Sequence, residues 1–201
     1  MEFLALFQKG GLVMYPILAA SLVALAIAFE RNAFYRKESL KTKGFVGQVV
    51  EFLQAGDKDK AVSLCQQSGA PGEVILTAMS EEQLGNREEV VLAVAKRKAL
   101  ELRKYLEYLS VIVTMAPLLG LLGTVTGMIQ SFSVLNVADG EPFAITGGVS
   151  EALIATATGL LVAILALCLY ACLSHRANSI IADVEYASTM YLAAGGKDDE
   201  N

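Results

Sequence analysis

One carboxyl group stands inside the most apolar stretch of the sequence. The segment Gly147 to Leu173, GGVSEALIATATGLLVAILALCLYACL, contains a single acidic residue, Glu151, near its start. A charged side chain at a bilayer centre costs about 2.5–3.5 kcal/mol on insertion scales, so an ionisable residue inside a membrane helix is by default a candidate for an ion or proton pathway. A carboxyl group there can take up and release a proton. Glu151 is therefore the first candidate for chemistry.

A second interpretation of Glu151 stays open on the residues alone. If the membrane helix starts later than Gly147, Glu151 lies at the outer interface as a solvated residue of the first helical turn. The positive end of the helix dipole favours an acid at that place. Such a residue would take no part in transport.

The other reactive side chains indicate no site. Cys168 and Cys172 lie four residues apart with His175 just beyond, but no acid stands beside them. Small apolar packing is the common use of buried cysteine, so we predict no metal ion. There is no Gly-rich phosphate loop ending in Gly-Lys-Ser/Thr and no hydrolase nucleophile motif. We expect neither an enzyme nor a cofactor.

The distribution of apolar residues indicates a membrane protein. Of 201 residues, 54% are hydrophobic and 18% are charged. The apolar residues gather in three blocks, each of about the 18 or more residues that a spanning helix needs. The blocks are Leu12–Phe29, Tyr108–Leu135 and Gly147–Leu173. We therefore expect three transmembrane helices.

The basic residues predict the orientation of the helices. Thirteen of the sixteen Lys and Arg lie between Arg31 and Lys104, whereas the loop Ser133–Thr146 has none and carries Asp139 and Glu141. Cytoplasmic loops are enriched in Lys and Arg. The large loop and the C-terminus are therefore expected in the cytoplasm, and the N-terminus and the acidic loop outside. The net charge of -5 hides this asymmetry and is no argument for nucleic-acid binding.

The large cytoplasmic segment is expected to be helical. Two short amphipathic helices are predicted before Gly56 and Gly69, the second with Asp57 as its N-cap, and a third follows Gly69. Asn86 precedes Glu89 by three residues, which is the spacing of a capping box. Because neither Gly nor Pro interrupts the chain before Pro117, we predict one continuous helix from about Arg87 to about Phe132. It would be roughly 69 Å long at 1.5 Å per residue, and more than half of it would project into the cytoplasm, with a possible bend at Pro117.

The predicted fold is thus an all-α membrane protein with three transmembrane helices and a helical cytoplasmic domain, in which helix two extends far into the cytoplasm. The expected segments are an extracytoplasmic N-terminal segment (1–11), membrane helix one (12–30), the cytoplasmic domain (31–107), membrane helix two (108–135), an extracytoplasmic loop (136–146), membrane helix three (147–173) and a cytoplasmic tail (174–201). The last residues, GGKDDEN, are expected to fray. Because Cys65 then lies in the reducing cytoplasm, we expect no structural disulfide.

Small residues recur along one side of the second and third blocks. Small side chains four residues apart let membrane helices approach closely. The sequence therefore predicts tight pairing of helices two and three, within one chain or between subunits. The predicted packing residues are Gly120, Gly123 and Gly127, next to Pro117, in the second block, and Ala152, Ala155, Gly159 and Ala163 in the third.

The same two segments carry a resemblance. APLLGLLGTVTGMIQSF followed by GGVSEALIATATGLLVAI resembles the paired signature of the MotA/TolQ/ExbB proton-channel family, and KGGLVMYPILAASLVALAIAFER resembles the family's first span. The resemblance covers nearly the whole chain and is closest to the TolQ/ExbB branch, because MotA proteins are longer and have four spans. The short N-terminal segment differs from that of ExbB proteins with a longer periplasmic extension. The subfamily therefore stays open.

The resemblance implies a machine rather than a lone channel. It implies a homopentamer, in the lipid of a bacterial inner membrane, around two copies of a single-span partner of the ExbD/TolR type, which in turn serves a TonB- or TolA-like protein. The proton-motive force would drive motion of the partner or of the ring, with a membrane Asp of the partner as central proton carrier. This chain would supply the pore wall, in which Glu151, Thr124 and Thr156 occupy the motif positions associated with the pathway.

Helix geometry disagrees with the resemblance about the second threonine of the pathway. On an ideal helix Thr156 is turned roughly 140° from Glu151, whereas Thr158, seven residues on, lies on nearly the same face. The resemblance favours Thr156 and the helix geometry favours Thr158. Thr124 has an ordinary alternative, because a mid-helix threonine commonly bonds back to the carbonyl of the preceding turn.

Two other function classes compete with the channel. A small-solute transporter subunit would normally show repeated halves and a broken helix. This sequence has three spans and no repeat, which argues against a transporter. A passive membrane scaffold would leave Glu151 without a purpose. The sequence decides neither whether the ion is H⁺ or Na⁺ nor what load is driven.

Overall fold

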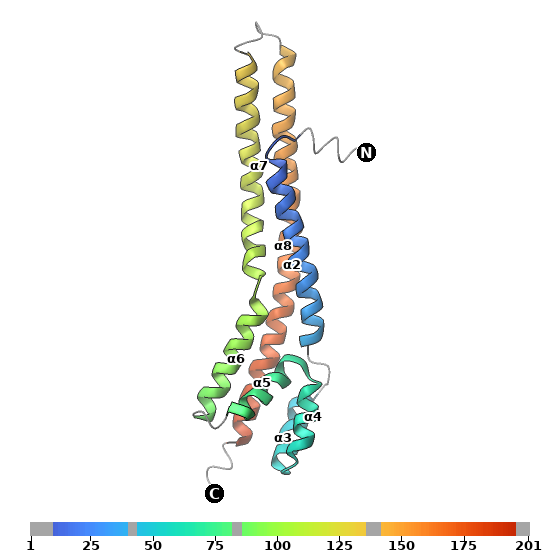
Figure 1. Ribbon diagram of the computed structural model, residues 1–201, viewed down its shortest axis with the longest axis vertical. Coiled ribbons are helices and arrows are strands. Elements are labelled where there is room, and N and C mark those ends of the chain that lie inside the picture. Colours follow the sequence, from blue (N-terminus) through green and yellow to red (C-terminus); the bar gives the residue numbers. More distant parts are fainter. Residues whose placement is uncertain (1–9, 40–43, 82–85, 136–141, 196–201) are drawn as a thin grey trace. The chain divides into compact units, whose positions relative to one another are not determined.

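The computed structural model describes residues 10–39, 44–81, 86–135 and 142–195, and all regular secondary structure in them is helical (Figure 1). Three segments are long and apolar enough to cross a membrane: Met14–Glu38, Arg87–Ser133 and Thr146–Ala194. The predicted all-α fold with three candidate membrane spans is therefore confirmed. The helices are α2 (Met14–Glu38), α3 (Phe45–Gln54), α4 (Lys58–Gln66), α5 (Gly69–Glu81), α6 (Arg87–Arg103), α7 (Leu106–Leu135) and α8 (Pro142–Gly195).

The chain divides into two compact units. The first unit comprises Met1–Phe29 and Tyr105–Cys172 and contains the start of α2, all of α7 and the first part of α8. The second unit comprises Glu30–Lys104 and Leu173–Asn201 and contains the end of α2, α3 to α6 and the end of α8. Each unit has its own packing.

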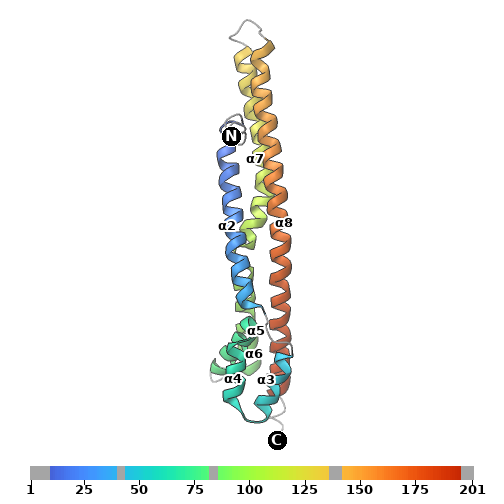
Figure 2. The ribbon, with the colours of Figure 1, turned by 90° about the vertical axis from the view of Figure 1, so that its right-hand side faces the viewer.

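In the first unit, α7 and the first part of α8 lie side by side and run antiparallel (Figures 1 and 2). Glycine allows this approach, because a β-carbon added at Gly159 would lie 2.6 Å from the Ala116 carbonyl oxygen and one added at Gly127 would lie 2.8 Å from the Gly148 carbonyl oxygen. Contacts below 3.0 Å require the backbones to move apart. The predicted tight pairing of the second and third blocks is therefore present within one chain.

The second unit has a small apolar core contributed by α3, α4, α5, α6 and the end of α8. Asn86 caps α6, since its side-chain oxygen accepts a hydrogen bond from the Glu88 backbone N–H at 3.2 Å. Asp57 precedes α4 without making a side-chain cap and pairs with Lys60 instead. The core residues are Phe45, Val46, Val49, Cys65, Ile75, Ala78, Val91, Ala187 and Tyr191.

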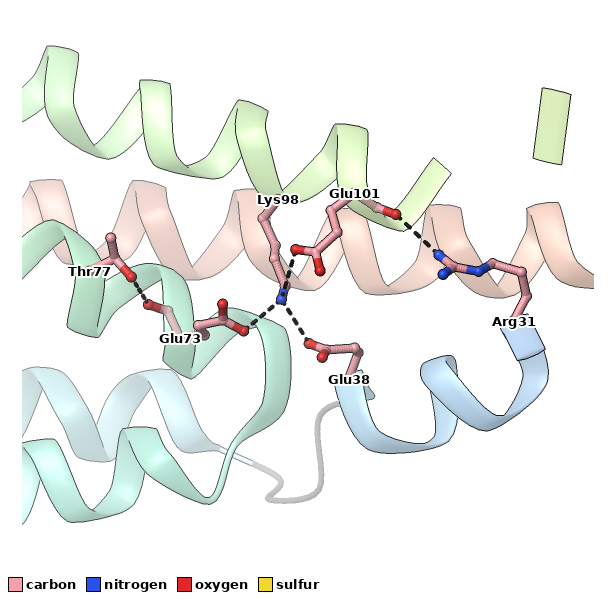
Figure 3. A network of polar contacts seen from close by, with 6 residues as sticks. All are labelled: Arg31, Glu38, Glu73, Thr77, Lys98 and Glu101. Carbon is pink, nitrogen blue, oxygen red and sulfur yellow. Dashed lines mark hydrogen bonds and ion pairs between the residues drawn. The ribbon is translucent and has the colours of Figure 1, made fainter. Parts of the chain in front are cut away.

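A buried lysine ties three helices of the second unit together (Figure 3). Lys98 on α6 places its ammonium group 2.6 Å from a Glu73 carboxylate oxygen on α5 and 3.2 Å from Glu38 at the end of α2. Glu101, one turn further on α6, lies 3.3 Å away. Burial alone would lower the pKa of Lys98, but the hydrogen bond to Glu73 and the charges of Glu38 and Glu73 outweigh it and raise that pKa.

The predicted continuous helix from Arg87 to Phe132 is wrong. α6 ends at Arg103 and α7 begins at Leu106, because Lys104 is extended (ψ 138°) and Tyr105 has a left-handed φ of 70°. The last carbonyls of a helix have no partner in the helix itself. Here Arg31 donates to the Glu101 carbonyl oxygen at 3.2 Å and the Tyr35 hydroxyl to that of Leu102 at 2.7 Å. Side chains from α2 therefore donate to two carbonyls at the end of α6, and that of Glu101 also accepts from the Lys104 backbone N–H at 3.2 Å.

The third apolar segment belongs to a longer helix than its apolar length indicates. α8 has 54 residues and runs from Pro142 through the predicted membrane segment 147–173 to Gly195. Most of the predicted cytoplasmic tail is therefore helical. The prediction that GGKDDEN frays lies outside the described residues, as does most of the predicted loop 136–146.

Candidate functional site: the α7–α8 seam and Glu151

A hydrogen bond joins α7 and α8 among small residues. Thr156 on α8 is half-buried, and its hydroxyl donates a hydrogen bond to the backbone carbonyl oxygen of Gly120 on α7 at 2.9 Å. Gly120 lacks a side chain, so the carbonyl is open to the neighbouring helix. A β-carbon added at Gly120 would lie 3.1 Å from the Thr156 α-carbon. Thr156 and Gly120, both predicted from the sequence, therefore meet directly.

The seam continues in both directions through small residues. Gly123 faces the side chain of Ala155, and Gly127 faces Ala152, where an added β-carbon would lie 3.0 Å from the Ala152 methyl group. The buried hydroxyl of Ser131 donates to the Gly127 carbonyl oxygen at 2.9 Å. Of the predicted glycine and alanine residues, Gly120, Gly123, Gly127, Ala152, Ala155 and Gly159 thus lie at this seam.

The other two candidate threonines bond to their own helices. The Thr158 hydroxyl donates to the Ile154 carbonyl oxygen at 2.8 Å, and the Thr124 hydroxyl donates to that of Leu121 at 2.6 Å. Both side chains are half-buried. Thr124 also lines an open groove along α7, together with Met128 and Phe132. Thr124 and Thr158 thus both donate to a carbonyl of the preceding turn of their own helix. Whether Thr156 or Thr158 lines a pathway stays a prediction.

Glu151 is half-buried on α8, one turn before Ala155. Its carboxyl group lies against the backbone of Gly11, in the turn that precedes α2. Glu151 makes no hydrogen bond or ion pair with the part of the chain that the structure describes. Within the described residues, the carboxylate therefore lies in van der Waals contact with the turn before α2.

Some residues of the site were not among the sequence candidates, and two of them are Ala116 and Gly11. Ala116 faces Gly159, and Gly11 contacts Glu151. Both stand inside the quoted motifs, Ala116 next to Pro117 and Gly11 in KGGLVMYP. A pair of glycines before an apolar block predicts a turn. It does not predict which residue packs against that turn.

The cysteine and histidine residues form no metal centre in the described ranges. No group of three His, Cys, Asp or Glu side chains there is arranged to hold a metal ion. Cys168 and Cys172 are exposed, as is His175, while Cys65 is buried in the core of the second unit. Burial raises the pKa of the Cys65 thiol to about 11.

The chain is similar to proteins that carry the names ExbB and TolQ. The chain is 36% identical over 175 residues to the putative biopolymer transport protein ExbB-like 1 of Synechocystis sp., covering 82% of this chain and 67% of that protein. It is 31% identical over 191 residues to a putative biopolymer transport protein ExbB homolog of Methanothermobacter thermautotrophicus, covering 93% and 68%. It is 26% identical over 221 residues to the Tol-Pal system protein TolQ of Haemophilus influenzae, covering 98% and 97%.

The family model for the MotA/TolQ/ExbB proton channel family matches residues 66–186. This range includes α5 to α7 and most of α8, and hence the whole α7–α8 seam with Glu151. The proteins of this family are channel components and not enzymes. The chain, with three helices able to span a membrane, therefore belongs to the MotA/TolQ/ExbB proton channel family as a multi-pass membrane protein.

Proposed function

We propose that this chain is the pore-wall subunit of an inner-membrane motor in which ion flow down the proton-motive force does mechanical work through a single-span partner of the ExbD/TolR type. The observation that carries the proposal is the half-buried carboxyl group of Glu151 in an apolar helix, without a partner in the described part of the chain. One elementary charge crossing 100 mV releases about 2.3 kcal/mol, so an ion gradient is a sufficient source of energy.

The arrangement of polar groups supports a path made by more than one chain. Thr156 and Thr158 stand on the same helix as Glu151, but their hydroxyls bond to backbone carbonyls and not to its carboxylate. A proton passing along α8 therefore needs a further acceptor. The acid of a partner helix, together with water in a small pore, supplies one, and Glu151, Thr124, Thr156 and Thr158 form this chain's share of the wall.

The exposed surface of the first unit supports assembly into a homopentamer around two partner helices. Large apolar side chains cover the faces of α7 and α8 that turn away from their seam, and lipid or other protein can cover such faces. The open groove with Thr124 offers a second helix a place to pack. The exposed residues include Leu118, Leu121, Val125 and Ile129 on α7, and Leu153, Leu160, Leu161 and Ile164 on α8.

The load is proposed to be a TonB- or TolA-like protein reached through the ExbD/TolR-type partner. The relatives named for biopolymer transport and for the Tol-Pal system support this assignment. In the proposed orientation, α3 to α6 face the cytoplasm, because the lysines and arginines between Arg31 and Lys104 favour that side.

The decisive variant is Glu151→Gln. Glutamine keeps the size of the side chain and can form hydrogen bonds, but it cannot exchange a proton. We expect the complex with the partner to assemble normally, and partner-dependent proton flux into liposomes, together with motor work in cells, to be lost.

The matched control is Glu185→Gln, which removes an exposed carboxylate from the same helix in the second unit. It is expected to leave flux unchanged. Normal proton flux and normal motor work in the Glu151→Gln variant would contradict the proposal. Glu151 would then be an interfacial residue of a membrane scaffold.

A further inference from the structure

Glu151 contacts the turn that leads into α2. A β-carbon added at Gly11 would lie 2.6 Å from the carboxyl carbon of Glu151 and 3.1 Å from its γ-carbon, and closer still to the carboxylate oxygen Oε1. The carboxylate of Glu151 thus occupies the space in which any other residue at position 11 would place its side chain. The two residues are 140 positions apart in the sequence, and both belong to the first unit.

The backbone of Gly11 also requires glycine. Its φ of +70° is left-handed, a conformation that residues with a side chain rarely adopt. The other glycines with positive φ differ from Gly11 in what surrounds them. At Gly44 and Gly56 an added β-carbon would have nothing within 4 Å, and at Gly69 it would meet the backbone carbonyl oxygen of Glu38 at 2.5 Å and no side chain among its nearest atoms. Gly11 is therefore more than a turn residue, because its missing side chain makes room for a functional group.

The neighbouring glycine provides a contrast. A β-carbon added at Gly10 would meet the side chain of Met14 at 2.5 and 2.7 Å and the Cγ2 atom of Ile154 at 3.2 Å. A flexible methionine can move aside, and the Ile154 contact requires a shift of only a few tenths of an ångström. Gly10 does not have a positive φ. Of the two adjacent glycines, only Gly11 lies against Glu151.

We infer that Gly11 is a positioning residue for the ion pathway: its bare α-carbon sets where the Glu151 carboxyl group can lie. The inference rests on the proposed role of Glu151. Because Glu151 makes no hydrogen bond within the described chain, packing against its neighbours decides its conformation. Proton exchange needs donor and acceptor within hydrogen-bond reach, so a displaced carboxyl group loses transfer even when the complex is intact.

The test is a set of four complexes of the full chain with its partner, reconstituted into liposomes: wild type, Gly11→Ala, Glu151→Asp and the double variant. Gly11→Ala is expected to lower proton flux about 10- to 100-fold, the range that a misplacement of about 1 Å can produce. Aspartate is shorter by one methylene and withdraws from the added methyl group. The double variant is therefore expected to return to the flux of Glu151→Asp alone, within about twofold, the usual error of additivity.

The rescue separates positioning from backbone strain. Strain at a left-handed φ is the same whether residue 151 is Glu or Asp, so a purely structural role predicts that the two losses multiply in the double variant. That outcome would overturn the inference, and so would wild-type flux in Gly11→Ala. Gly10→Ala is the control for the turn and is expected to keep its flux, and the amount of assembled complex is measured for every variant.

The outcomes also separate this inference from the proposed function. If Glu151→Gln abolishes flux while Gly11→Ala leaves it unchanged, Glu151 acts in the pathway and Gly11 does not position it. If Glu151→Gln keeps normal flux, the proposed function itself fails.

Discussion

The hydroxyl of Thr156 donates a hydrogen bond to the backbone carbonyl oxygen of Gly120 at 2.9 Å, from one apolar helix to another. It is a helix-to-helix bond between α8 and α7 in a seam made mostly of glycine and alanine. In an apolar solvent such bonds supplement the packing that small residues allow. The threonine that the family resemblance favours for the pathway is thus also a structural link, and a variant must be designed to separate the two roles.

Replacing Thr156 by valine removes the hydroxyl at nearly constant shape. We expect a loss of about 0.6 kcal/mol in stability, the average for hydrogen bonds between membrane helices. Thr156→Ser keeps the bond and should unfold like the wild type on heating in detergent. Thr158→Val is the control, because its hydroxyl bonds only to the Ile154 carbonyl of its own helix. Equal losses in the two valine variants would contradict a special role of the α7–α8 bond.

Replacing Gly159 by alanine tests the closeness of the seam. The new methyl group would lie 2.6 Å from the Ala116 carbonyl oxygen, which is backbone and cannot turn away. We expect a loss of about 1–3 kcal/mol, the usual cost of overpacking, seen as a lower midpoint of thermal unfolding in detergent. Gly147→Ala is the matched control on the same helix, since nothing lies within 4 Å of its added β-carbon. An unfolding midpoint of Gly159→Ala equal to that of the control would show that the helices can separate freely.

Replacing Lys98 by methionine tests the carboxylate cluster of the second unit. Removing one member of a buried ion pair costs about 3–5 kcal/mol, but the side chains of Glu73 and Glu101 are about half exposed, so we expect about 1–3 kcal/mol. Lys60→Met removes an exposed lysine paired with Asp57 and should have no measurable effect. The measurement is thermal unfolding in detergent.

The same cluster gives a prediction for pH. A lysine whose pKa is raised in the folded state contributes stability that is present below its unfolded pKa and is lost as pH rises through the folded value. The ordinary pKa of lysine is 10.5 and that of Lys98 is higher. The difference in unfolding temperature between wild type and Lys98→Met is therefore expected to be constant from about pH 6 to about pH 9 and to shrink only in more alkaline solution. A decrease between pH 6 and pH 9 would show that other groups control the cluster.

The buried thiol of Cys65 should resist alkylation. Burial raises its pKa from 9.0 to about 11. Because only the thiolate reacts, its reactive fraction at pH 8 is roughly 100-fold smaller than that of an ordinary thiol. Peptide mass spectrometry after iodoacetamide treatment should find Cys65 unmodified in the folded chain and modified after denaturation. Rapid labelling in the folded chain at pH 8 would contradict the packing of α4 in the core.

The proposed orientation is tested by single cysteines in a background with the native cysteines replaced. A cysteine at Lys96, which is exposed on α6, should react with a membrane-impermeant maleimide only from the cytoplasmic side. A cysteine at Gly147, with open space around it, should react from the opposite side. Labelling of Lys96→Cys from outside intact cells would contradict the orientation.

The sequence by itself determined the helical class and the candidate membrane spans. An apolar block of 18 or more residues is expected to cross the membrane as a helix. In lipid the backbone N–H and C=O groups must form their hydrogen bonds within the segment, and a helix does this. It also indicated which face of α7 and which face of α8 packs closely, since glycine spacing marks one face of a helix. Gly120, Gly127 and Gly159 all lie on these faces. These properties are local, so a single segment contains them.

The tertiary structure decided the end of α6 and the neighbour of Glu151. No glycine or proline marks Lys104 and Tyr105, and helix propensity there favours continuation. The break is accommodated by Arg31 and Tyr35, which lie about 70 residues earlier and donate to the carbonyls of Glu101 and Leu102. Likewise, KGG predicts a turn, but only the folded first unit brings Gly11 against Glu151. Both contacts join residues that are distant in the sequence. Such a pair produces no periodic pattern in either segment, because each segment could pack equally well against many other segments.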